Sequence, residues 1–258
     1  MTLKFYKYQG TGNDFVILDN RTQNLQLNTK QIAFLCDRRF GIGADGLMLL
    51  ENADGFDFKM VYYNSDGNES TMCGNGGRCL VKFAYHMGVF TQNTTFIAVD
   101  GPHEAFVAAN GWVHLKMIDV QKVEKGADYY FLNTGSPHHV QFVADIENHP
   151  IVAEGRTIRY SEKYAANKGT NVNFAQLQGD TLFVRTYERG VEDETYSCGT
   201  GVTAAAIAAL QHGATSPVSI KTLGGNLSVS YTKAPDYSYT NVFLNGPAEK
   251  VFEGNIEI

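Results

Sequence analysis

The sequence predicts an α/β (α+β) fold built from two similar halves, each holding one helix against several strands. Many short segments are rich in Val, Ile, Phe, Tyr and Thr, which favour strands. The motif Cys-Gly-x-Gly occurs twice, at Cys73 and at Cys198, and each copy precedes a helix-like stretch. Nearly half of the 258 residues separate the two copies, which indicates a duplicated unit.

Strand candidates run along both halves of the chain. In the first half they are Phe15–Asp19, Leu47–Glu51, Asp57–Tyr63, Phe96–Val99, Glu104–Ala108 and Trp112–Met117. In the second half they are Tyr129–Leu132, His139–Val143, Thr181–Glu188, Val218–Thr222, Leu227–Tyr231 and Tyr239–Leu244. Periodicity does not tell which strands pair, so their order stays open.

Three segments have the spacing of helices. Thr29–Arg39 is the first, with Asn28 as its N-cap, and its apolar face includes Cys36, which we expect in the core. The second follows Cys73 with apolar residues at helical spacing up to Gly88, and the third is the Ala-rich stretch after Cys198. The segment Gly41–Gly46 matches G-x-G-x-x-G but follows a helix and precedes a strand, so we expect a tight turn and not a dinucleotide site.

No low-complexity linker divides the halves, so the repeat sets the boundaries. We expect a first half of residues 1–117 plus 247–258, to which the last segment returns, and a second half of residues 118–246. The composition is that of a globular protein, and the net charge of −6 offers no basic surface for nucleic acid. We expect neither a signal peptide nor a membrane span, because no apolar run is long enough. Four cysteines in a chain of this length do not form a disulfide scaffold, which favours the reducing cytoplasm.

The repeated cysteine is the strongest functional signal. A thiol at a helix N-terminus faces backbone N–H groups and the positive end of the helix dipole, both of which favour the reactive thiolate. A lone cysteine is usually a small buried hydrophobe, but two copies of one motif before two helices favour a pair of acid–base groups. Cys73 and Cys79 do not have the spacing of a structural zinc site and no second pair exists, so we expect no metal.

Polar residues precede each cysteine at the ends of strands. Asn64 lies before Cys73, and Glu188 and Arg189 lie before Cys198. Strand ends are common ligand sites, and Arg189 can bind a carboxylate in a bidentate manner. A surface ion pair is the alternative for Glu188 and Arg189. Further candidates are Asn13, in a glycine-rich turn, Asn171, and His138, although a single histidine is more often structural.

The chain resembles the diaminopimelate epimerase family along nearly its whole length. The matching segments occur in the order Gly10–Phe15, Phe40–Gly46, Asn64–Gly67, Met72–Cys79, Pro137-His138, Gly169–Phe174, Tyr187–Gly190 and Cys198–Gly201. The Met72–Cys79 segment is the most specific of them. The resemblance implies two strand-rich, barrel-like halves, each around a central helix, with the active site in the cleft between them.

The resemblance also implies the roles of individual residues. Cys73 and Cys198 would be the two acid–base groups. The carboxylate at the reacting centre would be held by Gly74, Asn75, Gly199 and Thr200, with help from Asn13. Asn64, Asn171, Glu188 and Arg189 would bind the distal end, and His138 and Glu188 would adjust cysteine ionisation. Ser136 departs from the family, which commonly has Gly-Asn-Pro-His where this chain has Gly135-Ser136-Pro137-His138.

The implied reaction converts LL-2,6-diaminopimelate to its meso form, without a cofactor, for lysine and peptidoglycan synthesis. A small-molecule substrate is then the expected partner, with a homodimer left open. A proline-type racemase is the nearest alternative, although Arg189 and the asparagines favour a substrate with a second charged end. A non-catalytic amino-acid-binding protein would need no paired thiols, and a thiol–disulfide oxidoreductase would need the absent C-x-x-C motif.

Overall fold

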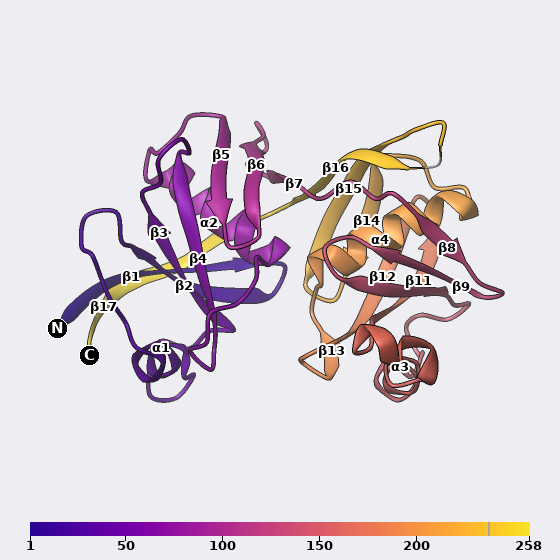
Figure 1. Cartoon of the computed structure of the whole chain (residues 1–258), viewed down its shortest axis with the longest axis horizontal. Coiled ribbons are helices and arrows are strands. Elements are labelled where there is room, and N and C mark those ends of the chain that lie inside the picture. The colour runs from indigo at the N-terminus through magenta and orange to yellow at the C-terminus, as the bar shows by residue number, and fades with distance from the viewer. Residues whose placement is uncertain (237) are drawn as a thin grey trace. The chain divides into compact units, whose positions relative to one another are not determined.

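The computed structural model describes residues 1–236 and 238–258, and its chain forms two compact units (Figure 1). Unit 1 comprises Met1–Leu115 and Gly246–Ile258, and unit 2 comprises Lys116–Asn245. The C-terminal segment therefore folds with the N-terminal part of the chain. Ile258 accepts a 2.8 Å hydrogen bond from the amino group of Met1, so both termini belong to unit 1.

The strands of unit 1 pair in the order β17-β1-β2-β3-β4-β5-β6-β7. Their bounds are β1 Thr2–Gly10, β2 Asn13–Asp19, β3 Gly46–Glu51, β4 Phe58–Asn64, β5 Asn93–Ala98, β6 Gly101–Val107, β7 Val113–Lys116 and β17 Glu249–Glu257. The pairs β2–β3 and β4–β5 are parallel and the others are antiparallel.

The strands of unit 2 pair in the order β8-β9-β10-β11-β12-β14-β15-β16, and the short β13 extends the end of β12. Their bounds are β8 Val123–Lys125, β9 Tyr129–Asn133, β10 Pro137–Phe142, β11 Asn171–Gln178, β12 Thr181–Glu188, β13 Asp193–Thr195, β14 Val218–Thr222, β15 Gly225–Lys233 and β16 Tyr239–Gly246. Here β10–β11 and β12–β14 are the parallel pairs.

The two units have the same topology. Read from β17 in unit 1 and from β8 in unit 2, the pairs are antiparallel, antiparallel, parallel, antiparallel, parallel, antiparallel and antiparallel. Parallel neighbours need a crossover, and a helix supplies each one. The prediction of a strand-rich α/β fold with few helices is confirmed, and the shared strand order supports a duplicated unit.

The helices occupy equivalent places in the two units. Their bounds are α1 Thr29–Cys36, α2 Gly74–His86, α3 Ile151–Arg159 and α4 Gly199–Ala209, followed by the 3₁₀ turn η2 Leu210–His212, with another 3₁₀ turn, η1 Glu162–Asn167, after α3. In each unit the second helix is central: α2 packs on β1, β2, β3 and β6, and α4 packs on β9 to β12, β14 and β15 (Figure 1). The strands of each sheet thus surround one helix.

The sequence of α4 explains its central place. Its residues from Val202 to Ala209 are all buried, so the helix has no polar face to turn to water. Most of them are alanines, whose small side chains let strands approach on several sides. In α2 the first eight residues are buried, and Tyr85 and His86 reach the surface. The N-terminal end of α2 is therefore buried inside unit 1, and its C-terminal end lies at the surface.

The outer helices differ from the prediction. Asn28 caps α1 as expected, in a capping box with Gln31, but the helix ends at Cys36 and not at Arg39. The Asp37 carboxylate accepts the backbone N–H groups of Arg39 and Phe40, which turns the chain instead of continuing the helix. The helix α3 was not predicted, because its exposed positions outnumber its buried ones and give a weak apolar pattern.

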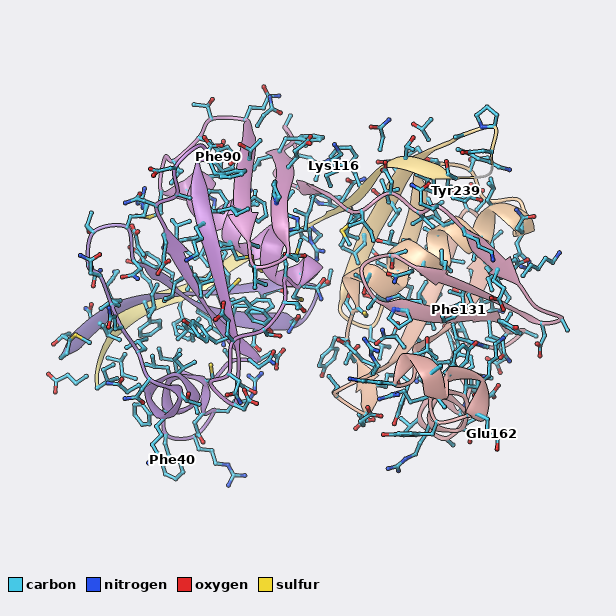
Figure 2. All side chains as sticks on the ribbon, in the orientation of Figure 1. Phe40, Phe90, Lys116, Phe131, Glu162 and Tyr239 are labelled. Carbon is cyan, nitrogen blue, oxygen red and sulfur yellow. The ribbon has the colours of Figure 1, made fainter. Side chains whose placement is uncertain are left out.

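Five strands were also missed: β1, β8, β11, β13 and β17. Most residues of β17 are exposed, so this strand lacks an alternation of apolar and polar residues. β8 and β13 are only three residues long, which is too short for such a pattern to be recognised. The predicted turn at Gly41–Gly46 is confirmed, since it links α1 to β3, and Gly43 has a φ of 83°. Next to this turn Phe40 points away from unit 1 and is 79% exposed (Figure 2).

Cys36 lies in the core, as predicted, at 3% exposure within an apolar cluster of unit 1. Among the described residues, no helix has the length and apolar character needed to cross a membrane. Within the same residues, no three His, Cys, Asp or Glu side chains are grouped as metal ligands.

Unit 1 should depend on β17 for its stability. A chain that ends at Ala248 loses one of the two antiparallel partners of β1 and the packing of Ile256 and Ile258 on the unit 1 core. We expect unit 1 to unfold at markedly lower urea concentration, measured by circular dichroism. Val251→Ala, at a position 55% exposed on the same strand, should change stability by no more than about 0.5 kcal/mol. Equal urea midpoints for the truncated and full chains would contradict a structural role for β17.

Candidate functional site

Cys73 is the N-cap residue of α2. Its backbone is extended (φ −106°, ψ 129°), and its carbonyl accepts the 2.7 Å bond from Gly77 N–H that starts the helix. The thiol is partly exposed, although the helix behind it is buried. Because the first N–H groups of a helix have no intrahelical acceptor, this thiol lies where a helix end favours negative charge.

The side chain of Asn13, at the start of β2, contacts this thiol. Its amide nitrogen donates a 2.6 Å hydrogen bond to the Asp45 carboxylate, which fixes the direction of the amide. Its oxygen therefore faces the Cys73 sulfur at 3.7 Å and the Asn75 side-chain nitrogen at 3.4 Å. A carbonyl oxygen only accepts, so this contact suits the protonated thiol of Cys73.

Charged residues behind Asn13 hold that arrangement in place. Burial would raise the pKa of the Asp14 carboxyl, but hydrogen bonds and charge from Arg38 and Lys7 hold it well below its usual range. Arg38 also binds Asp45 at 2.8 Å. Asp45 therefore has a cationic partner on one side and accepts the hydrogen bond from Asn13 on the other.

Arg78 places a buried cation inside α2, near the N-terminal end of the helix. The side chain is fully buried, and its guanidinium donates to Thr11 Oγ1 at 3.3 Å and to the Gly74 carbonyl at 3.5 Å. Burial lowers the pKa of Arg78, while electrostatic attraction to Cys79 and Cys73 raises it. This attraction is mutual, so Arg78 favours the thiolate of Cys73 and opposes the effect of Asn13.

Asn64 ends β4 at the same sheet edge as Asn13. The register pairs Phe15 with Gly46 and Gly46 with Asn64, so the start of β2 and the end of β4 are two strands apart at one edge. Asn64 is exposed there, and its backbone closes the turn to Gly67. Unit 1 thus brings Asn13, Cys73 and Asn75 into contact and places Asn64 at the same edge.

Cys198 occupies the equivalent place in unit 2, as the N-cap of α4. Its backbone is extended (φ −114°, ψ 112°), and its carbonyl accepts from Val202 N–H at 2.9 Å. It is more buried than Cys73, at 7% exposure. Its sulfur lies 3.5 Å from the Thr200 hydroxyl, a group that can donate a hydrogen bond.

His138, at the start of β10, is completely buried in unit 2. Burial, together with the charge of Arg189, lowers the pKa of His138 to about 3, and the hydrogen bond with Asn173 opposes this only in part. The ring is therefore neutral at physiological pH. Its two nitrogens contact Asn173 Nδ2 at 3.0 Å and Ser136 Oγ at 2.9 Å.

Asn171, Glu188 and Arg189 meet at neighbouring strand ends. The Asn171 side-chain oxygen accepts from the backbone N–H of Arg189 at 2.9 Å, so its nitrogen points the other way, to Ser136 Oγ at 3.2 Å. Thr195 donates to the Glu188 carboxylate at 2.9 Å. Unit 2 thus gathers Asn171, Glu188 and Arg189 at one edge.

The remaining cysteines are unlike these two. Cys36 and Cys79 are buried, and burial raises the pKa of both thiols, that of Cys36 to about 12. Neither lies at a helix start: Cys79 is inside α2 and Cys36 is the last residue of α1. They lack the environment of a reactive thiol.

Several residues that surround the N-cap cysteines of α2 and α4 were not predicted from the sequence. Asn173 was part of a matched segment but received no role, and Arg78 and Asp45 were not singled out. One signal for Asn173 was available: Asn171 and Asn173 are two apart on β11, so their side chains share one face of the sheet. Arg78 had no such signal, because a lone arginine in a helix is normally exposed.

Comparison with known proteins places the chain in a family. Residues 5–122 and 130–251 match the family model described as diaminopimelate epimerase. A relative of that name from Flavobacterium psychrophilum is 55% identical, over 98% of this chain and 100% of its own length. The chain belongs to the diaminopimelate epimerase family. Relatives of the same name from Chlorobaculum tepidum and Aquifex aeolicus are each 40% identical, over 96% and 98% of this chain and 99% and 98% of their own lengths.

Solved structures of other proteins share the fold. A phenazine biosynthesis protein of the PhzF family from Bacillus anthracis matches with a TM-score of 0.79 at 13% identity, over 100% of both chains. A hydroxyproline epimerase from Agrobacterium vitis matches with a TM-score of 0.69 at 13% identity, over 99% of this chain and 92% of that one. Membership of the diaminopimelate epimerase family makes this protein an isomerase with a small-molecule substrate.

The two motif glycines should differ in their tolerance to substitution. A Cβ at Gly201 would overlap the Asn173 side-chain oxygen, and that side chain is buried and held by Thr186 and His138. A Cβ at Gly76 would meet its nearest neighbours at 3.3–3.5 Å. Overpacking typically costs about 1–3 kcal/mol, whereas alanine gains up to about 1 kcal/mol over glycine in a helix. We expect a clear loss for Gly201→Ala and little change for Gly76→Ala.

Urea unfolding of the two variants measures this difference. Each substitution is made at the same position of the repeated motif, so the helix-propensity gain is matched. Equal stability of the two variants would show that Asn173 moves aside without loss.

His138 should make the stability of unit 2 depend on pH. The folded protein holds it neutral with a pKa of about 3, and the unfolded chain protonates it below about 6.5. The unfolded state then binds more protons, so the free energy of unfolding falls as pH decreases from about 6.5 towards 3, by up to about 1.4 kcal/mol per pH unit.

Urea unfolding between pH 7 and 5 tests this expectation. Burial also lowers the pKa of His139, which adds a slope of the same sign, so the comparison needs a variant. His138→Gln should unfold with a shallower pH dependence than the wild type. An unchanged slope would mean that His138 is not kept neutral by the fold.

Proposed function

We propose that this protein converts LL-2,6-diaminopimelate to meso-diaminopimelate with Cys73 and Cys198 as its two acid–base groups. The observation that carries the proposal is the repeated placement of a cysteine at the N-cap of the central helix in two units of equal topology. The family name supplies the substrate. Both thiols would serve one substrate molecule, from opposite faces of its α-carbon.

The chemistry needs one thiolate and one thiol. The thiolate removes the α-proton and becomes a thiol, and the electron pair stays on the α-carbon and its carboxylate. The second thiol then delivers its proton to the opposite face and becomes a thiolate. The stereocentre is inverted and the total number of protons on the two sulfurs is unchanged, so the reverse reaction uses the same groups with their states exchanged.

The helix ends supply the electrostatic part of the mechanism. Negative charge develops on the substrate carboxylate as the α-proton leaves, and helix N-termini bind such anions through backbone N–H groups. In this proposal Gly74, Asn75, Gly199 and Thr200 hold the carboxylate. Their positions as the first residues of α2 and α4 support this role. Asn13, in contact with Cys73, would complete the set.

The distal end of the substrate would bind at the strand edges. Asn64 ends β4, and Asn171, Glu188 and Arg189 lie together in unit 2. Diaminopimelate carries an amino acid group at each end, so this edge must recognise a carboxylate and an ammonium group. Arg189 suits the carboxylate and Glu188 the ammonium. Buried His138 would act on Cys198 through its neighbours.

The proposal includes no cofactor. The two helix ends and two thiols account for both proton transfers and for the developing charge. The reaction would take place in the cytoplasm and serve lysine and peptidoglycan synthesis.

Loss of either cysteine should abolish epimerisation. Cys73→Ala and Cys198→Ala each remove one acid–base group, a change that costs about 10²-fold or more in rate. Cys36→Ala is the matched control, because its thiol is buried in the core of unit 1. The measurement is conversion of LL-diaminopimelate in D₂O, with solvent deuterium at the α-carbon followed by proton NMR.

Proline is offered in the same assay as a second substrate. Epimerisation at near wild-type rate by either catalytic variant would refute the two-cysteine mechanism. Rapid exchange with proline and none with diaminopimelate would refute the proposed substrate and leave the cysteine chemistry standing.

A further inference from the structure

We propose that Ser136 is a positioning residue for Cys198. It connects buried His138 to Thr200 in a chain of hydrogen bonds that directs the Thr200 hydroxyl proton to the Cys198 sulfur. The inference rests on the proposed acid–base role of Cys198. All four residues belong to unit 2.

Asn173 sets the direction of the hydrogen-bond chain at its buried end. The Asn173 side-chain nitrogen donates to the His139 carbonyl at 3.0 Å, and its oxygen accepts from the Thr186 hydroxyl at 3.0 Å. The amide can therefore face only one way. The second hydrogen on its nitrogen points to His138 Nδ1 at 3.0 Å, so Nδ1 accepts and the proton of the neutral ring is on Nε2.

The donors and acceptors in the middle of the hydrogen-bond chain, at Ser136, then have a single arrangement. His138 Nε2–H donates to Ser136 Oγ at 2.9 Å, and the Asn171 side-chain nitrogen donates to the same oxygen at 3.2 Å. Asn171 is itself oriented, since its oxygen accepts from the backbone N–H of Arg189. These two donors use the acceptor sites of the hydroxyl. The Ser136 proton is left for Thr200 Oγ1, at 3.3 Å.

The last step reaches the sulfur. Thr200 Oγ1 accepts from Ser136, so its own proton is available to Cys198 Sγ at 3.5 Å. The backbone of Thr200 is fixed as well, because its carbonyl accepts from the Thr134 hydroxyl at 2.8 Å. A donor aimed at sulfur stabilises the thiolate more than the thiol. The chain therefore favours the form of Cys198 that removes a proton.

Comparison with unit 1 explains why Ser136 reaches Cys198 through Thr200. The first register pair of β2–β3 joins Phe15 to Gly46, and the first register pair of β10–β11 joins His138 to Asn171. Asn13 precedes Phe15 by two residues, and Ser136 precedes His138 by two residues. Asn13 and Ser136 therefore hold equivalent positions in the two units. Asn13 is long enough to contact the Cys73 sulfur itself. The shorter side chain of Ser136 contacts Thr200, and Thr200 contacts Cys198.

Charged and titratable groups near Cys198 come from two strands and from the turn after one of them. They are His138 on β10, Glu188 at the end of β12, and Arg189 directly after it. The charge of Arg189 acts on His138. Replacing Ser136 by alanine changes none of these charges, so a change in Cys198 ionisation would come from the hydrogen-bond chain.

The test measures thiolate formation directly. In a Cys73→Ala background, the rate of alkylation of Cys198 by iodoacetamide is followed against pH, with the modified peptide quantified by mass spectrometry. Ser136→Ala should raise the pH of half-maximal rate by roughly half a unit to one unit, because one oriented donor is lost. Thr200→Val should raise it at least as much, and Ser136→Thr, which keeps the hydroxyl, should restore the wild-type value.

Ser219→Ala, at an exposed position on β14, is the control and should leave the profile unchanged. A profile unaltered by Ser136→Ala would overturn the proposal, as would equal shifts for the alanine and threonine variants. The readout does not depend on turnover. Failure of LL-diaminopimelate epimerisation in the wild type, with a shifted alkylation profile in Ser136→Ala, would overturn the proposed function and support the hydrogen-bond chain.

Discussion

The N-terminus of a helix surrounded by its own sheet is the constraint on which each unit depends. A helix end carries backbone N–H groups that need acceptors, and burying such an end without partners is costly. Here the buried helices α2 and α4 begin directly after a cysteine, at a sheet edge lined by polar side chains. The fold thus presents the positive pole of a helix beside a thiol, which suits an anionic substrate and a developing negative charge.

Buried polar groups around these helix ends are held by specific partners. Arg78, a residue of α2, donates hydrogen bonds to Thr11 and Gly74, and His138 lies near α4 between Asn173 and Ser136. A fully buried cation or imidazole is costly unless it is hydrogen-bonded, and each such bond has a required direction. These requirements restrict the side chains near the thiols to few orientations, which is how a core can orient reactive groups.

The two units have one topology and different polar surroundings. Cys73 faces the carbonyl oxygen of Asn13, and Cys198 faces the hydroxyl of Thr200. An acceptor suits a thiol and a donor suits a thiolate, while the buried charge of Arg78 acts on Cys73 in the opposite sense. The proposed reaction needs one sulfur protonated and one ionised, and such unequal environments would serve it. Duplication of the fold supplies two equivalent positions, and local side chains distinguish them.

The sequence by itself determined the features that depend on neighbouring residues in the chain. The repeated Cys-Gly-x-Gly motif, the two helices after it, the cap at Asn28 and the turn at Gly41–Gly46 are local patterns, and the structure contains each of them. Strand pairing and the burial of Arg78 were decided only by the tertiary structure. Polar edge strands carry no clear alternation, and the direction of a hydrogen bond such as that from Asn173 to His138 depends on residues brought together from separate strands.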